Sequence, residues 1–525
     1  MTTTSALERT TWDGRLDRWS DRLNPIVVKE VRQALRGKFF QWTFWATISL
    51  ASLVIVIQLL SAGAGGIVDG RKLFGVLFGC LVVAVHGLVP LWAYFSMSSE
   101  WEEGTYDLLV LSNLRPWRIV TGKLFAAGVQ AMLYYTAFLP FLAFAFAAGG
   151  IDALSVAFVF SASLVFSLLS SVIALDASTL ARQRLWRMIL LVGLFAILSV
   201  GCWASGFAAY TILTEPALFV SSEFWLAVGA MLTIGLTLGA FAACLATARI
   251  SHPEENVSTP SRVVALLAVL GLIGWLAFAR TKTSTDTPVV ACILSATGFP
   301  CLFLLSVVWT TEADTLSRRV AAQVPTRVPA LLVAPFLPGG GRGVLFSFLL
   351  HLLLACGVYG SVSGLPPASV GWLPGPDGAT GFAFALAAYS AIYLFIPGAI
   401  VSRAQYAGPR ARLVARLVIL GVLAFGMAVP TLILGLSGSD FEHSFRHPFT
   451  PVEGARIFLE QSVEPAQRAT YVGGLALFVI VGLFANAPRI VRAVTEVREA
   501  AGRRRAQRLA SGNTTEPPLH AAPQP

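Results

Sequence analysis

The stretch "EWEEGTYDLLVLSNLRPWRIVTGKL", residues 100–124, is a charged interruption between two long apolar segments. Three of its first four residues are carboxylates, and a short run of leucine and valine follows them. A transmembrane helix needs about 20 apolar residues, so this run is too short to cross a bilayer. The stretch is therefore predicted to be a loop that joins two membrane spans outside the hydrocarbon region.

The composition of the whole chain is typical of a membrane protein. The 525 residues are 56% hydrophobic and 13% charged, with a mean hydropathy of +0.72. Soluble domains carry about 25% charged residues. Long charge-free runs recur along the sequence and predict an all-α, polytopic transmembrane helix bundle of about 12 spans. The predicted spans are 41–61, 73–96, 124–149, 153–175, 188–213, 224–247, 263–280, 289–310, 344–364, 382–402, 413–436 and 469–487.

Lysine and arginine are distributed unevenly between the predicted loops. With the N-terminus placed in the cytoplasm, 31 of the 38 Lys and Arg residues fall in cytoplasmic segments and 7 in external ones. This asymmetry follows the positive-inside rule and predicts that both termini are cytoplasmic. It also accounts for the net charge of +10 without nucleic-acid binding, so no nucleic-acid partner is expected.

Before the first predicted span, the sequence "NPIVVKEVRQALRGKFF" (24–40) has the spacing of an amphipathic helix. Apolar residues recur on one side of the helix, and polar residues, among them Lys29 and Glu30, fill the other side. Pro25 suits the first turn of a helix, and Gly37 permits a bend before the span. We predict an interfacial helix that lies against the lipid bilayer at the inner membrane surface.

The spans fall into two sets of six, which predicts two membrane units. We expect a cytoplasmic lead with the amphipathic helix (1–40), a six-span unit (41–250), a second six-span unit (251–487) and a basic, largely disordered cytoplasmic tail (488–525). In each set a charged loop follows the second span. The segments "SMSSEWEEGTYDLL" and "VVWTTEADTLSRRV" both place two small polar residues before a glutamate, which is an indication of internal duplication.

The loop after the second span is expected to connect a cytoplasmic partner with the membrane. Gly104 and Thr105 favour a turn and a helix start, and the acids just before them would be stabilised near a helix N-terminus. Pro116 can open the next helix, and Lys123 is interpreted as the inner boundary of the third span. A short helix tied at both ends to spans could pass a push to the second and third spans.

The amphipathic segment and this loop together resemble the membrane subunit of ABC-2 type transporters. In that family a carboxylate precedes Gly-Thr, and an acid, paired leucines, a serine and a hydrophobic-x-Gly-Lys motif follow. The resemblance covers roughly residues 20–250. The matching residues are Glu103, Gly104, Thr105, Asp107, Leu108, Leu109, Ser112, Ile119, Val120, Gly122 and Lys123.

The resemblance implies an export permease in the bacterial cytoplasmic (inner) membrane, driven by ATP that a separate ATP-binding cassette subunit hydrolyses. The chain itself lacks the sequence G-x-x-x-x-G-K-[ST], which is consistent with an ATPase partner in trans. The substrate stays open, as does the choice between a homodimer and an intrachain pseudo-dimer. The resemblance implies that the ATPase-coupling contacts are Glu100, Glu102, Glu103, Asp107, Arg115 and Arg118.

Two other functions are compatible with the sequence, an ion-coupled secondary transporter and a non-transporting membrane scaffold. We find no nucleophile with a matching base, and we expect no catalytic residue, cofactor or metal in the chain. His443 and His447 lie four residues apart, with Asp440 and Glu442 nearby. Pro448 and the loop setting argue against a metal site there.

Two features inside the predicted spans concern helix packing. His86 lies in the middle of the second span, where a neutral histidine is expected to hydrogen-bond to a neighbouring helix. Gly235 and Gly239 form a GxxxG pattern in the sixth span, which predicts a close helix contact.

Overall fold

The computed structural model describes most of the chain, and every regular element in it is a helix. Within the described ranges, 12 helices are long and apolar enough to cross a membrane, which confirms the predicted all-α bundle and its number of spans. The chain is a multi-pass membrane protein. The described residues are 25–61, 63, 69–104, 115–180, 184–252, 254–282, 287–365, 375–403, 409–437, 450–459 and 465–510.

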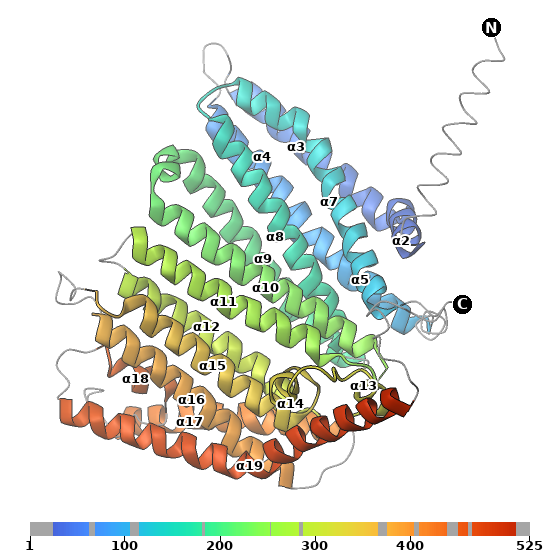
Figure 1. Cartoon of the computed structure of the whole chain (residues 1–525). Coiled ribbons are helices and arrows are strands. Elements are labelled where there is room, and N and C mark those ends of the chain that lie inside the picture. The colour runs from blue at the N-terminus through green and yellow to red at the C-terminus, as the bar shows by residue number, and fades with distance from the viewer. Residues whose placement is uncertain are drawn as a thin grey trace. The chain divides into compact units, whose positions relative to one another are not determined.

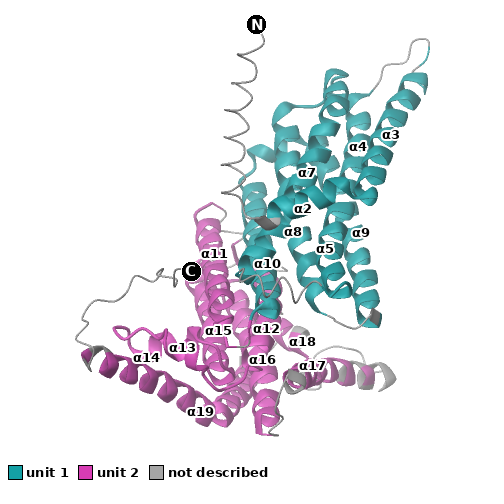
Figure 2. Ribbon diagram, turned by 90° about the vertical axis from the view of Figure 1, so that its right-hand side faces the viewer, with its two compact units in different colours: residues 1–251 teal, residues 252–525 magenta. Residues whose placement is uncertain are grey.

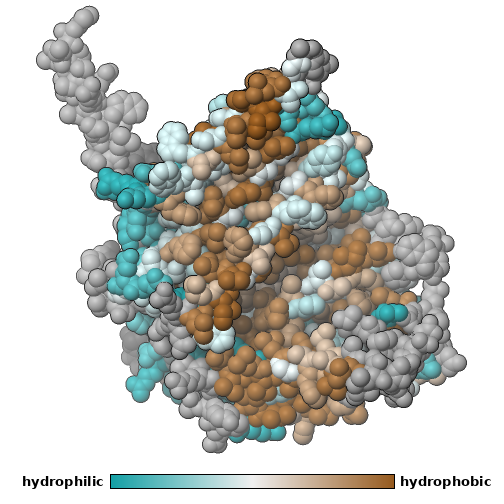
Figure 3. All heavy atoms as spheres, turned by 180° about the vertical axis from the view of Figure 1, so that it is seen from behind, coloured by the Kyte–Doolittle hydropathy of each residue, from teal (hydrophilic) through white to brown (hydrophobic). Residues whose placement is uncertain are grey.

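The chain divides into two compact units, residues 1–251 and 252–525 (Figure 2). The sequence had placed this boundary after residue 250. Hydrophobic side chains dominate the described surface in the view of Figure 3. Many large apolar residues are exposed on the spans, as expected where the surrounding medium is lipid rather than water.

Unit 1 contains six spans, which are built from eight helical elements (Figure 1). In addition, the short helix α2 precedes the first span, and the 3₁₀ turn η2 precedes the sixth span. A π-helical turn, η1, interrupts the second span between α4 and α5. The elements are α2 (Pro25–Arg36), α3 (Lys38–Ser61), α4 (Gly70–Val82), η1 (Val83–Leu88), α5 (Val89–Glu102), α7 (Pro116–Ala147), α8 (Ala153–Leu180), α9 (Arg184–Thr214), η2 (Pro216–Val220) and α10 (Ser222–Ile250).

Unit 2 also contains six spans, and short helical pieces cover two of its loops (Figure 1). The elements are α11 (Ser258–Lys282), α12 (Thr287–Thr310), α13 (Arg318–Ala321), α14 (Ala330–Val333), η3 (Ala334–Phe336), α15 (Gly340–Val362), α16 (Pro376–Arg403), α17 (Pro409–Ser437), α18 (Pro451–Arg456) and α19 (Pro465–Ala510).

The amphipathic segment forms α2, and the chain breaks at Gly37 before α3, as predicted. The side chains of Val27 and Ala34 are buried, which fits the predicted apolar face. Glu30 differs from the prediction, because it is buried on this same packing face and not on the polar side. Helical periodicity shows only which positions are apolar and which are polar. It cannot show that one of the polar residues pairs with a buried charge on another helix.

The π-helical turn η1 places His86 between two neighbouring helices. Its Nδ1 lies 2.9 Å from Ser205 Oγ of α9, and its Nε2 lies 2.9 Å from Ser163 Oγ of α8. Tyr135 of α7 donates to the same serine oxygen at 2.7 Å. This network confirms that His86 bonds to adjacent helices, and it joins four helical segments at membrane depth.

The GxxxG pattern of α10 lies against α8, as predicted. A Cβ added to Gly239 would meet Leu169 Cδ2 at 2.5 Å, and one added to Gly235 would meet Leu169 Cδ1 at 3.0 Å. The absence of side chains at these two positions therefore lets Leu169 pack into the surface of α10, which brings the two helices together.

Helix α15 begins inside the glycine-rich sequence that was expected to belong to a loop. Gly339 has a φ of +140°, a conformation that L side chains rarely adopt. The next glycines pack against other backbones: a Cβ on Gly341 would lie 2.6 Å from the carbonyl oxygen of Arg489, and one on Gly343 would collide with the carbonyl of Trp309. Glycine is thus needed here for close packing as well as for the turn.

The helix of the last span continues well past residue 487, the predicted end of that span. Where the sequence suggested a largely disordered tail from residue 488, α19 remains helical to Ala510. Val497 and Ala500 in this extension are buried in one cluster with Val320 of α13 and Val324, which follows α13. Residues 511–525 lie outside the described residues.

The packing of Gly343 leads to a stability prediction. Gly343→Ala forces a methyl group into the backbone of α12, so we expect a loss of about 1–3 kcal/mol of stability, typical of overpacking. The matched control is Gly360→Ala on the same helix, where an added Cβ meets nothing within 4 Å. Thermal unfolding of the purified chain in detergent should show a lower midpoint only for the first variant. Equal midpoints would contradict the close contact.

Candidate functional site

A buried ion cluster joins three elements of unit 1, and we call Glu30, Glu100 and Lys123 the unit 1 charge cluster. Lys123 Nζ of α7 lies 2.8 Å from Glu30 Oε1 of α2 and 3.1 Å from Glu100 Oε1 of α5. Its third donor reaches the carbonyl oxygen of Ser96 at 2.9 Å. The ammonium group therefore uses all three of its N–H bonds. Lys29, which is exposed, approaches Glu100 to 3.4 Å from the outer side.

The unit 1 charge cluster is almost fully removed from solvent. The side chain of Lys123 is 1% exposed, and those of Glu30 and Glu100 are 3% and 7% exposed. Two carboxylates and one ammonium group would leave a net negative charge, which Lys29 offsets at the rim. Buried charges are tolerated when they are paired and hydrogen-bonded, as they are here. The cluster therefore fixes α2 to the ends of α5 and α7.

The acids of the loop lie at a helix end different from the predicted one. Glu100 and Glu102 belong to the last turn of α5, at the negative end of its dipole, and not in front of a helix N-terminus. Two cations offset this unfavourable position. Lys123 neutralises Glu100, and Arg187 of α9 lies 3.1 Å from Glu102 Oε1.

The predicted coupling residues have different environments. Glu100 is buried in the unit 1 charge cluster, so any coupling role must act through α2 and α7 and not by direct contact. The side chains of Glu102, Glu103, Arg115 and Arg118 are exposed. Glu103 follows α5, and Arg115 precedes Pro116, which opens α7 as predicted. Asp107, like the expected helix of this loop, lies outside the described residues.

The helix of the third span begins at Pro116, before Lys123. Two further turns of helix bring the lysine side chain beneath α2. Neither Glu30 nor Lys123 was singled out as a paired residue from the sequence. The available signal was a single lysine within a long apolar helix, since such a charge requires a partner.

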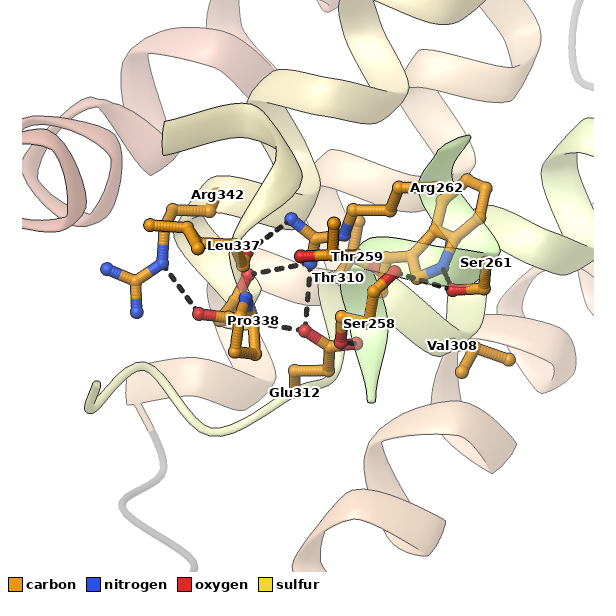
Figure 4. Close-up of polar contacts among 12 residues, drawn as sticks. Ser258, Thr259, Ser261, Arg262, Val308, Thr310, Glu312, Leu337, Pro338 and Arg342 are labelled. Carbon is orange, nitrogen blue, oxygen red and sulfur yellow. Dashed lines mark hydrogen bonds and ion pairs between the residues drawn. The ribbon is translucent and has the colours of Figure 1, made fainter. Parts of the chain in front are cut away.

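Unit 2 has a second charge network with two buried arginines at its centre, and we call Arg262, Glu312, Asp314, Arg342, Arg489 and Glu496 the unit 2 charge cluster. Arg262 Nη2 of α11 lies 2.8 Å from Glu312 Oε2, just beyond α12 (Figure 4). Its Nη1 donates to the carbonyl oxygens of Pro335 and Leu337 at 2.7 and 2.6 Å. Glu312 also accepts from Ser258 Oγ and, at 2.7 Å, from the backbone N–H of Gly339.

Arg342 extends this network from α15 to α19. Its Nε donates to the carbonyl of Pro338 at 2.6 Å (Figure 4), and its Nη1 lies 3.3 Å from Glu496 Oε2 of α19. Asp314 completes the connection, because Arg489 Nε lies 3.0 Å from its Oδ2 and the N–H of Gly341 donates to its Oδ1 at 2.7 Å. The loop before α15 is thus held by two buried guanidinium groups.

The two clusters occupy corresponding places in their units. Glu100 and Glu312 both lie at the end of the second span of a unit, after a pair of small polar residues. Lys123 and Arg342 both lie in the first turns of the third span. The segments that the sequence paired as an indication of duplication therefore provide the acidic half of a buried ion network in each unit.

The arrangement of these groups favours a structural role. Most polar atoms of both clusters lie at hydrogen-bond distance from other protein atoms, and the cations at their centres, Lys123, Arg262 and Arg342, are buried. His443 and His447, the histidines weighed for a metal site, lie outside the described residues. Comparisons with protein-family models, with curated proteins and with solved structures find no match for this chain.

Removing the central cation of unit 1 should cost considerable stability. Lys123→Met leaves two buried carboxylates without their partner, and breaking a buried ion pair in this way typically costs about 3–5 kcal/mol. The thermal unfolding midpoint of the purified chain in detergent measures the effect.

Lys72→Met provides the control for this experiment. Lys72 pairs with Asp69 at 3.5 Å, and its side chain is 79% exposed. Exposed pairs contribute about 0–1 kcal/mol, so this variant should unfold close to the wild type. If both lysine variants lost the same amount of stability, the buried pairs would not be what holds α2 on α5 and α7.

Proposed function

We propose that this chain is the membrane-spanning permease subunit of an ATP-binding cassette exporter. It would move a substrate across the bacterial cytoplasmic membrane with ATP that a separate subunit hydrolyses. The observation that supports this proposal most is the unit 1 charge cluster. It ties the amphipathic helix α2 to the ends of the second and third spans, which are the elements that the ABC-2 resemblance links with an ATPase partner.

The cluster gives the proposed coupling a physical route. A push on α2 acts on Glu30, which is bonded to Lys123 at 2.8 Å within α7. Separating these groups would expose or strand a buried charge, at a cost of about 3–5 kcal/mol. The three elements are therefore expected to move as one body, so that force applied at the surface tilts α5 and α7 together and does not merely displace α2.

The exposed charges near the cluster provide a surface for the partner. Glu103 lies at the end of α5, and Arg115 and Arg118 lie at the start of α7, all three with exposed side chains. The asymmetry of lysine and arginine predicts that this end of unit 1 faces the cytoplasm. Exposed acids and bases at these two helix ends favour a partner surface with a complementary charge pattern, which speeds association and fixes the orientation of the partner.

Charge reversal at this surface tests the proposal. The full chain is purified from its native host with a tag, and the ATPase activity that co-purifies is measured. Reversing Glu103 and Asp107 together, as Glu103→Arg with Asp107→Arg, should lower the co-purified activity about tenfold, the factor that corresponds to about 1.4 kcal/mol of lost binding energy.

The control is Lys72→Glu, which reverses an exposed charge at the start of α4, at the other end of the second span. This variant should retain the associated ATPase. Two results would refute the proposed function: a wild-type chain that brings down no ATP-hydrolysing partner, or a doubly reversed variant whose assembly and ATP-dependent export equal those of the wild type.

A further inference from the structure

The helix α19 changes direction where its predicted membrane span ends. The span stops at residue 487, and Pro488 lies inside the helix directly after it. A proline within a helix removes a backbone hydrogen bond and causes a kink. In Figure 1 the last part of α19 turns away from the part before it, and in Figure 2 it extends to one side of α11 and α15. The kink keeps residues 488–510, about 35 Å of helix, close to the membrane surface. We call these residues the α19 extension.

One face of the α19 extension is fixed to the rest of unit 2. Val497 is buried in the apolar cluster that includes residues of α13. Arg504 Nη1 donates to the carbonyl oxygen of Val324 at 2.7 Å, and Glu496 Oε2 lies 3.3 Å from Arg342 Nη1 of α15. These contacts hold the helix against rotation about its axis. The opposite face therefore presents its side chains in a fixed direction, which lowers the entropy cost of binding a ligand there.

The outward face of the α19 extension is uncharged along its centre. The residues of this strip follow one another at spacings of four, seven, four and three, which places them on one side of a helix. All of them are exposed, and a Cβ added to the glycine among them would meet nothing within 4 Å. A helix face that is turned to water usually carries its charges at the centre, so this strip is unusual for a solvated surface. Its residues are Val491, Thr495, Gly502, Ala506 and Leu509.

Exposed arginines lie along both edges of the uncharged strip. Arg492 and Arg503 share one edge, because eleven residues make three turns of helix, and Arg498 and Arg505, seven residues apart, share the other. Glu499 lies 3.8 Å from Arg503 and offsets part of the charge on the first edge. The positive-inside rule accounts for the number of arginines at this end of the span but not for their division between two edges. This division is typical of a helix that lies flat at the membrane surface, with arginine side chains extended toward the headgroups.

The loop that packs on the α19 extension adds exposed apolar side chains. Leu331 and Leu332 of α14 are 62% and 63% exposed, and Val328, just before this helix, is 43% exposed. Other residues of α14 pack against the extension, so these side chains lie near it. They fall outside the candidate spans, where exposed leucines are not explained by surrounding hydrocarbon. The bilayer interface is a surface that offers acyl chains and anionic phosphate groups together, and it therefore fits both the apolar and the basic residues.

We propose that the α19 extension lies flat on the inner surface of the membrane and that its arginines bind the headgroups of anionic phospholipids. The planar guanidinium group matches the geometry of a phosphate oxygen pair. The extension directly follows a membrane span, so lipid is the anionic partner with the highest local concentration. A protein interface usually has aromatic anchors at its centre, whereas this strip consists of small and aliphatic residues. The assignment does not depend on an export function.

Photo-crosslinking from the outward face tests this orientation. A benzophenone amino acid replaces Ala506 in one preparation of the full chain and Gln507 in another. Both positions are exposed, but Gln507 lies about 100° around the helix, nearer the packed face. The chains are placed in nanodiscs of phosphatidylcholine with a minor fraction of phosphatidylglycerol, and mass spectrometry identifies the adducts after irradiation. We expect clearly more lipid adduct from position 506 than from position 507. No lipid adduct at position 506, or an equal yield at both positions, would overturn the proposal.

Removal of arginines tests the charge component. Adducts at position 506 should contain more phosphatidylglycerol than its share of the nanodisc. Arg498→Gln with Arg505→Gln leaves the unit 2 charge cluster intact and should lower this enrichment at least about fivefold, the factor for about 1 kcal/mol per basic residue near an anionic surface.

The matched control is Arg280→Gln with Lys282→Gln, which removes two cations at the opposite end of α11 from the unit 2 charge cluster. These charges lie more than a Debye length of about 10 Å from the α19 extension, so the enrichment should stay within about twofold of the wild type. A wild-type chain without enrichment, or an arginine variant that retains it, would refute the binding of anionic headgroups.

Irradiation in the membranes of the native host separates a lipid surface from a protein partner. Position 506 should again form lipid adducts, which leave the electrophoretic mobility of the chain almost unchanged. If the chain were instead crosslinked mainly to another protein, this face would be a protein interface and the proposed contact with lipid would be wrong.

Discussion

The arrangement of α2, α5 and α7 in unit 1 depends on the need to pair the buried ammonium group of Lys123. A buried cation in the membrane is costly unless each donor has a partner, and here two carboxylates and a carbonyl oxygen supply all three. The two carboxylates need the lysine as much as the lysine needs them, because Glu30 and Glu100 are also buried. This pairing sets where α2 must lie, how far α5 extends and how deep in α7 the lysine sits. The aromatic and aliphatic packing around these helices fills space but leaves many alternatives open, whereas the ion cluster permits only one arrangement.

Unit 2 meets the corresponding requirement with arginine. A guanidinium group has five donors in a planar fork, and so it can organise a backbone as well as bind a carboxylate. Arg262 and Arg342 collect the carbonyl groups of residues 335, 337 and 338, and the glycines at 339–343 let those backbones approach. The acid partner, Glu312, keeps the place that Glu100 has in unit 1. A shared acid with different cations is what a diverged duplication would leave, because the buried charge must be kept neutral while its surroundings change.

The sequence was sufficient to predict the spans, because each lies in a long run without charged residues. In a chain of this composition, a run of about 20 apolar residues has few possible structures other than a membrane-spanning helix. The sequence was also sufficient for local features with a steric cause, such as the break at Gly37, the helix start at Pro116 and the contact of Gly239 with Leu169. It was insufficient for the clusters. Glu30 was assigned to a polar face and Lys123 to a membrane boundary, because pattern reasoning treats a charge as a mark of solvent. A pairing over 93 residues, as between Glu30 and Lys123, has no local signal. The same limit applies to the coupling residues, of which Glu100 turned out to be buried.

The charge clusters and the apolar groove between α16, α17 and α19 differ in how strongly they resist movement of the helices. Ion pairs buried among helix ends resist separation, because a charged group that leaves its partner finds no other charged group in the hydrocarbon of the lipid. The walls of the groove between α16, α17 and α19 are mostly apolar, so separating them in hydrocarbon costs packing but breaks no ion pair. Of the spans of unit 2, α17 has the smallest buried share, with Phe425 and much of its surface exposed, so it has the least packing with which to resist displacement. A change of conformation within unit 2 is therefore cheapest where α17 meets the apolar groove between α16, α17 and α19. On this view the buried ions define the parts that move as units, and this groove defines where such parts can separate.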